Sequence, residues 1–151
     1  MRTILLLTLT TFLIACNSTI SAKEPHLTEQ ESFLIESVQN TPYSAVIKHL
    51  DVKVIPSDYP KEFQHVYNAK VLKTLKGETL ETISYSMLVE TEEEPVLEKN
   101  PILITLCKDQ EGYYWPGTGA QFQNTRSHLE LAEKAAALVY DSTKQYSHCD
   151  Q

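Results

Sequence analysis

The chain has 151 residues, of which 42% are hydrophobic and 22% charged, with a formal net charge of -7. This length fits one domain, and the apolar share is enough for a packed core, so a wholly disordered chain is excluded. The acidic balance argues against nucleic acid as the main partner, because phosphate binding needs clustered Lys and Arg. The 3 cysteines are an odd number, which leaves one over if the other two pair.

Residues 1–15 are predicted to be a signal peptide. Met1 and Arg2 give a short positive start, and an apolar run follows over residues 4–14. This run is shorter than the roughly 20 apolar residues that a membrane-spanning helix needs. A positive start before a short apolar run is typical of a secretory signal.

The end of the run, Leu13-Ile14-Ala15-Cys16, resembles the lipobox of bacterial lipoproteins. The resemblance implies cleavage before Cys16, a diacylglycerol on its thiol, and a lipid-anchored place in the bacterial cell envelope. The next residue is Asn17, and an Asp there would suggest inner-membrane retention, so the outer membrane facing the periplasm is favoured. Ordinary cleavage after Ala22 is the alternative. Residues 16–26 then form a lipidated tether, and residues 27–151 form a single α+β domain.

With Cys16 used for the anchor, Cys107 and Cys149 remain in an oxidising compartment, where a disulfide is the expected state. The bridge would tie the end of an apolar strand to the C-terminus. A metal site formed by His148, Cys149 and Asp150 is the alternative. It is less favoured because no Cys-x-x-Cys or His pair supports it, so no metal or cofactor is predicted.

Two capping boxes predict two helices. Thr28 and Glu31 stand three residues apart before an apolar face, and this helix should end near Asn40. Ser127 and Glu130 have the same spacing at the start of a second apolar face, which predicts a closing helix with Ser127 as its N-cap.

The middle of the chain is predicted to be β. The first strand is predicted over residues 43–54, where Val46, Leu50, Val52 and Val54 share one parity. Strands at residues 66–75 and 80–89 follow, and the clean alternation of the latter is typical of an antiparallel sheet with one wet face. The apolar run at residues 102–107 predicts a central strand that is covered on both faces. Shorter strands are expected at residues 113–115 and 120–122.

The order and spacing of these strands resemble the bacterial secreted domains that look like the netrin-like module of tissue metalloproteinase inhibitors. The resemblance covers residues 43–122, with a long strand ending in Leu75-Lys76-Gly77 and a Tyr-Tyr-Trp strand before Gly117 and Gly119. It implies a small antiparallel OB-like β-barrel or curved sheet, flanked here by an N-terminal and a C-terminal helix. Those inhibitors chelate the protease metal with an N-terminal Cys-x-Cys, which this chain lacks, so inhibition by that route is not implied.

The sequence carries none of the motifs of P-loop, serine hydrolase or zinc protease sites. The acidic run at residues 90–94 lacks the spacing of a calcium loop, and a solvated loop is favoured. The 5 histidines show no metal-ligand spacing within one element, and ordinary surface roles are expected for them. The chain is therefore predicted not to be an enzyme.

The candidate ligand-binding residues are Tyr113, Tyr114 and Trp115, three large rings beside a glycine-rich turn. The alternative is that at least one of the rings is core. The favoured function is an envelope lipoprotein that binds a protein or wall component, with an inhibitor or immunity protein as the narrower variant. The alternatives are an assembly accessory of an envelope complex and, less favoured, a hydrolase whose site is built across loops.

Overall fold

A computed structural model describes residues 26–56, 62–90, 93–117, 119–138 and 146–149. The predicted signal peptide, the lipidation site at Cys16 and nearly all of the tether lie outside the described residues. Within the described ranges, no helix has both the length and the apolar character needed to cross a membrane.

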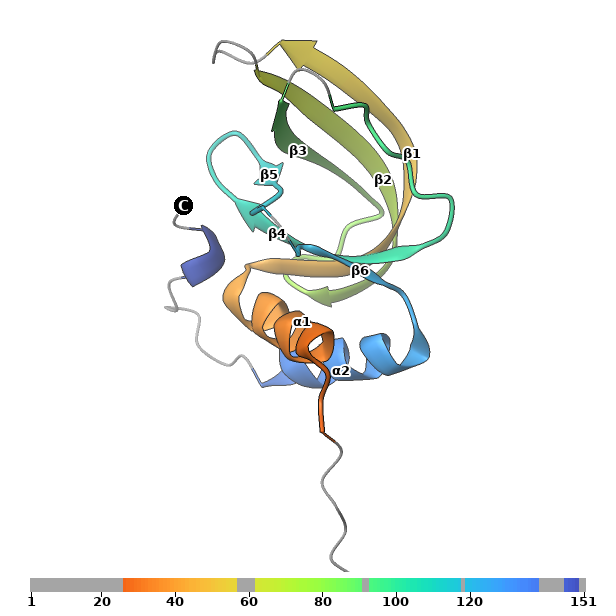
Figure 1. Cartoon of the computed structure of the whole chain (residues 1–151), viewed down its shortest axis with the longest axis vertical. Coiled ribbons are helices and arrows are strands. Elements are labelled where there is room, and N and C mark those ends of the chain that lie inside the picture. Colours follow the sequence, from red (N-terminus) through yellow and green to blue (C-terminus); the bar gives the residue numbers. More distant parts are fainter. Residues whose placement is uncertain (1–25, 57–61, 91–92, 118, 139–145, 150–151) are drawn as a thin grey trace, which may run out of the picture.

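The described residues contain two α-helices and six strands, which agrees with the predicted α+β class. In chain order the elements are α1 (Glu29–Asn40), β1 (Tyr43–Pro56), β2 (Glu62–Lys76), β3 (Thr82–Glu90), β4 (Ile102–Lys108), β5 (Tyr113–Tyr114), β6 (Gln121–Gln123), α2 (Arg126–Ala137) and a short 3-10 helix, η1 (Ser147–Cys149). Figure 1 shows α1 and α2 packed together below the curved sheet, with the strands rising away from them.

Five of the strands form a closed ring of pairings. The sheet order is β1-β2-β3-β5-β4-β6, and β1 also pairs with β4, which joins the two sides. The prediction of a wholly antiparallel sheet is wrong, because β3 and β5 pair in parallel. β5 pairs antiparallel with β4 as the second strand of a hairpin. The other edge of β5 pairs with β3, which runs in the same direction as β5. The sheet is therefore mixed.

The inside of the ring and the space below it form two apolar cores that share β4. Alternate residues Ile102, Ile104 and Leu106 point into the ring, while Leu103 points toward the helices. All of β4 from Ile102 to Cys107 is buried, which confirms the predicted central strand. The ring core is completed by Tyr43, Ala45, Ile47, Tyr67, Ala69, Ile83 and Tyr85. The helix core is completed by Leu34, Val38, Phe122, Ala132 and Ala135.

Of the residues of shared parity named for β1, only Val52 packs against the ring core. Leu50 is 57% exposed and Val54 is 49% exposed, whereas Ala45 and Ile47 lie in the ring core. The pairing of β1 with β2 shifts register after His49, so one residue is extra on β1. Such a bulge moves the following side chains to the opposite face. The side chains of β1 therefore do not alternate regularly between the two faces along the whole strand.

The two helix starts have different outcomes. The capping box of α1 is confirmed, since the Glu31 N–H donates to Thr28 Oγ1 at 3.1 Å and the Thr28 N–H donates to Glu31 Oε2 at 2.9 Å. The predicted cap of α2 is wrong, because Thr125 is the N-cap and accepts from the His128 N–H at 3.1 Å. Ser127 lies in the first turn instead, and its hydroxyl donates to Glu31 Oε1 at 3.2 Å. It joins the two helices.

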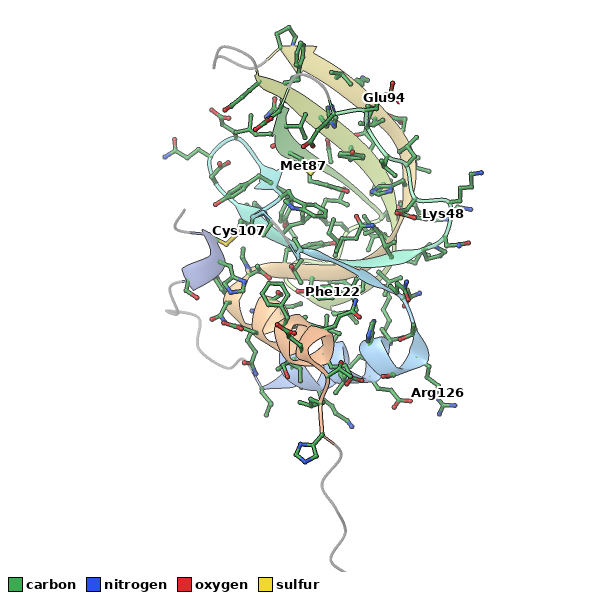
Figure 2. The ribbon with its side chains drawn as sticks, viewed as in Figure 1. Lys48, Met87, Glu94, Cys107, Phe122 and Arg126 are labelled. Carbon is green, nitrogen blue, oxygen red and sulfur yellow. A yellow bond between two sulfur atoms is a disulfide. The ribbon has the colours of Figure 1, made fainter. Side chains whose placement is uncertain are left out.

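The predicted disulfide is present between Cys107 and Cys149, whose Cα atoms are 5.5 Å apart. It connects the end of β4 to η1, and its sulfur atoms are drawn in yellow at Cys107 in Figure 2. Because the Cys149 sulfur is bonded to Cys107, it is not a free thiolate for the alternative metal site, of which Asp150 lies outside the described residues. No group of three His, Cys, Asp or Glu side chains in the described part of the chain could hold a metal ion.

Candidate functional site

Tyr113 lies on the core side of the predicted aromatic cluster. Its ring packs against Tyr43 with centroids 4.9 Å apart, and its hydroxyl donates to Glu78 Oε1 at 2.6 Å. Burial, and next the hydrogen bond to Glu78, raise the pKa of Tyr113 above its usual value. This ring therefore fills one end of the ring core, as the alternative interpretation of the cluster expected.

Tyr114 and Trp115 have different surroundings from Tyr113. The Tyr114 hydroxyl donates to the carbonyl oxygen of Cys149 at 2.9 Å, so this ring is held by the disulfide-linked segment. The Trp115 ring stacks on Tyr85 with centroids 6.5 Å apart and an interplanar angle of 25°. Both side chains are half-buried. The predicted cluster is thus divided between the core and a partly open surface.

Tyr114 and Trp115 line a groove of about 590 Å³ along β3 and β5. The other lining residues are Pro56, Gln64, Ser86, Met87, Leu88, Asp109, Glu111, Pro116 and Gly117. Among the described residues, those that line this groove include two carboxylates but no Lys or Arg. The groove is therefore acidic as well as aromatic.

One wall of the groove is a strand edge. The Trp115 N–H donates to the Ser86 carbonyl oxygen at 2.8 Å, and the pairing of β3 with β5 goes no further than Ser86. Residues two apart along a strand direct their backbone groups to the same side, so the N–H and C=O of Leu88 face the groove. β2 occupies only the opposite edge of β3, as far as Glu90. Within the described ranges, no strand pairs with β3 at Leu88 on the groove side.

A second cavity, of about 350 Å³, lies beside the groove. Met87 and Trp115 line both spaces, so the two share a wall. The remaining lining residues are His49, His65, Tyr67, Tyr85, Glu93, Glu94, Val96, Glu98 and Gln121. Figure 2 shows Glu94 on the segment after β3, on the side of the ring away from the helices.

His49 is buried in this cavity wall, which contradicts the predicted surface role. It is 9% exposed, and its Nε2 lies 2.7 Å from the Tyr85 hydroxyl oxygen. The Glu98 N–H donates to its Nδ1 at 3.2 Å, so Nδ1 is the acceptor and the proton lies on Nε2. Burial lowers the pKa of His49, and the nearby Glu98 opposes this only in part. A neutral His49 therefore donates to Tyr85 and fixes its hydroxyl.

His65 and His128 are also buried rather than on the surface. His128 is 9% exposed, and its Nδ1 lies 2.8 Å from the Gln123 carbonyl oxygen, so it joins α2 to β6. His65 is 2% exposed, and within the part of the chain that the structure describes its Nδ1 has no hydrogen-bond partner. The sequence did carry a signal for His65, because it shares the parity of Tyr67 and Ala69, which lie in the ring core.

The side chains of the second cavity are suited to binding. Burial raises the pKa of Tyr67 and of Tyr85, so both hydroxyls are neutral near pH 7 and act as hydrogen-bonding groups. The rings of Tyr67 and Tyr85 stack with centroids 5.2 Å apart, and Trp115 continues the row. Carboxylates stand at the rim of this aromatic wall.

The groove and the cavity thus lie next to each other at the β3–β5 side of the ring. No protein-family model, curated protein or solved structure matches this chain.

Proposed function

We propose that the chain is a non-enzymatic lipoprotein of the bacterial cell envelope that binds a protein partner. The lipid on Cys16 and the place at the outer membrane facing the periplasm rest on the lipobox resemblance. The closed ring of five strands supports an OB-like barrel as the fold of the binding domain. The partner would bind in the groove that Tyr114 and Trp115 line.

The observation that carries this proposal is the strand edge at Leu88 beside two aromatic rings. An extended segment of a partner can add to such an edge, with main-chain hydrogen bonds for affinity and side-chain pockets for specificity. Tyr and Trp are the residues that most often dominate binding energy at protein interfaces. A wall polysaccharide would use the rings but would leave the strand edge unpaired, so the groove favours a protein.

The charge of the groove indicates which partner segment fits. Asp109 and Glu111 lie at the rim, and the whole chain carries a net charge of -7. Complementary charge raises association rates and suppresses wrong partners, so a basic segment is expected. An inhibitor or immunity protein that blocks a basic toxin or hydrolase is the narrower form of this proposal.

Photo-crosslinking tests the site. A crosslinking residue at Leu88 should capture a partner in intact envelopes, while the same residue at the exposed Leu50 on β1 should not. Leu88→Pro removes the N–H that faces the groove, and proline is tolerated at a free strand edge. It should therefore abolish capture by a crosslinker placed at Gly117. Leu88→Ala shortens the side chain but keeps the N–H, and should preserve capture.

The outcomes separate the alternatives. One stoichiometric partner supports an inhibitor or immunity protein, whereas a membrane complex supports an assembly accessory. Unchanged capture in Leu88→Pro and in Trp115→Ala, with wild-type far-UV circular dichroism, would refute the groove as the site. Mass spectrometry of the mature N-terminus tests the anchor, and an unmodified Lys23 start would refute it.

A further inference from the structure

The second cavity has an aromatic wall of unusual continuity. The rings of Tyr67, Tyr85 and Trp115 form a row in which neighbours are stacked at 13° and 25°. At the other end of the row, the His65 ring contacts the Tyr67 ring edge-on, with ring centroids 6.2 Å apart. At about 350 Å³ the cavity is at the small end of the range for sites that hold small molecules.

An acidic segment lies over this wall. The backbone of the segment is held in two places, by the Glu98 N–H that donates to His49 and by a hydrogen bond between the Val96 backbone and the Tyr67 hydroxyl. These contacts bring the exposed carboxylates of Glu93, Glu94 and Glu98 to the cavity. Among the residues that the structure describes, no Lys or Arg lines the cavity to balance them.

His65 adds a buried imidazole to the wall of the cavity. It lines the cavity, it is only 2% exposed, and its Nδ1 has no hydrogen-bond partner among the described residues. A buried polar atom without a partner is unfavourable, and most such atoms in folded proteins find one. A ligand with an N–H group would give this nitrogen a donor.

We infer that the cavity binds an organic cation, a guanidinium or a primary ammonium group. Its N–H groups donate to His65 Nδ1 and to the carboxylates of Glu93, Glu94 and Glu98. Its charge lies beside the aromatic row, whose half-buried end member Trp115 can attract a cation. A planar guanidinium fits this combination best, since it stacks on rings and donates to several acceptors at once. The cation is either a free small molecule or an Arg or Lys side chain of another protein.

The test uses the only tryptophan of the chain, Trp115, as a fluorescent reporter in the cavity wall. Propylguanidinium is titrated into the purified chain in parallel with propylurea, which has nearly the same shape and no charge. Propylguanidinium should change the fluorescence with saturation, and propylurea should bind at least about tenfold more weakly because it lacks the charge-assisted hydrogen bonds. Equal binding of the two probes, or no binding of either, would overturn the inference.

Variants assign the binding to this cavity. Glu93→Gln, Glu94→Gln and Glu98→Gln combined keep the side-chain volumes, and should weaken binding of propylguanidinium by about tenfold or more. The matched control changes three exposed glutamates outside the cavity, Glu29, Glu81 and Glu130, to Gln. It alters the net charge equally and should leave binding unchanged. Equal weakening in both triple variants would show an effect of net charge alone and would contradict the site.

His65→Phe keeps a buried ring, removes the acceptor, and should also weaken binding; the exposed carboxylate variants remain decisive if it does not fold. Two further probes distinguish the sources of the cation. A capped Ala-Arg-Ala peptide that binds more tightly than propylguanidinium supports a protein side chain, and agmatine that binds more tightly supports a free small molecule.

Discussion

Removal of the disulfide should cost the domain a large part of its stability. The bridge joins two residues that are 42 positions apart in the sequence. In the loop-closure model, a cross-link over this length lowers the entropy of the unfolded chain by an amount worth about 4 kcal/mol at 25 °C. Since small domains are stable by only about 5–15 kcal/mol, the reduced form should be marginal.

The bridge also positions a groove residue, which adds a second and smaller effect. η1 carries the Cys149 carbonyl to which the Tyr114 hydroxyl donates at 2.9 Å. If η1 leaves β4 when the bridge is broken, this hydrogen bond is lost and contributes about another 1 kcal/mol. For a domain of this size, the total corresponds to a fall of about 10–20 °C in the unfolding midpoint.

The assay is thermal unfolding followed by far-UV circular dichroism, on the same chain before and after reduction. Reduction leaves both sulfur atoms in place, so it measures the cross-link without a change of packing. Cys107→Ala with Cys149→Ala should reproduce the loss and add about 1 kcal/mol for the buried sulfur. Tyr114→Phe keeps the bridge and should lose only about 1 kcal/mol. A reduced chain that melts within about 3 °C of the oxidised chain would refute the reasoning.

Three further outcomes are expected from local geometry. Gly119→Ala should destabilise the fold by about 2–4 kcal/mol, because the added methyl would lie 2.0 Å from an aromatic carbon of α1 at a φ of +86°. Gly117→Ala, at a φ of +113° with no atom of the described residues within 4 Å, should cost only about 1 kcal/mol. Equal losses in the two variants would contradict the clash. Burial lowers the pKa of His49 below 6.5, so the folded state favours the neutral ring. The free energy of unfolding should therefore have its full value above about pH 6.5 and should fall as the pH drops below it. His49→Gln should flatten this slope in urea titrations at about pH 5 and 7.5, and an unchanged slope would exclude His49 as its source. Thr125→Ala should lower the free energy of unfolding by about 1 kcal/mol in the same assay. A larger loss in Ser127→Ala would contradict Thr125 as the N-cap and favour Ser127 instead.

Much of the fold follows from local patterns that the sequence displays. The Thr28 capping box needs only residues that are three apart, and the run at residues 102–107 needs only continuous apolar character. The pairing of Cys107 with Cys149 followed from the cysteine count once Cys16 was given to the anchor. Each of these features has a physical cause within a short stretch of chain or in the composition.

The features that sequence reasoning missed depend on pairing between distant segments. The bulge after His49 is a property of how β1 meets β2, and it decides which β1 residues are buried. The parallel pairing of β5 with β3 depends on how the β4–β5 hairpin packs against β3. The second cavity brings His49 of β1 together with Trp115, which follows β5, so it depends on the pairing of segments that are distant in the sequence. Residue types alone could not reveal it.

The closure of the ring by β1 and β4 has a consequence for how the chain folds. The residues that pair there, from Tyr43 with Leu106 to Ile47 with Ile102, are about 60 positions apart in sequence. Contacts of such long range slow the search for the native state, so folding times in the millisecond-to-second range are expected. Until β4 arrives, the apolar start of β1 has an open edge, which is the kind of surface that aggregates. A chain that stops short of residue 102 would keep that edge exposed, so the ring can close only when both β4 and β5 are present.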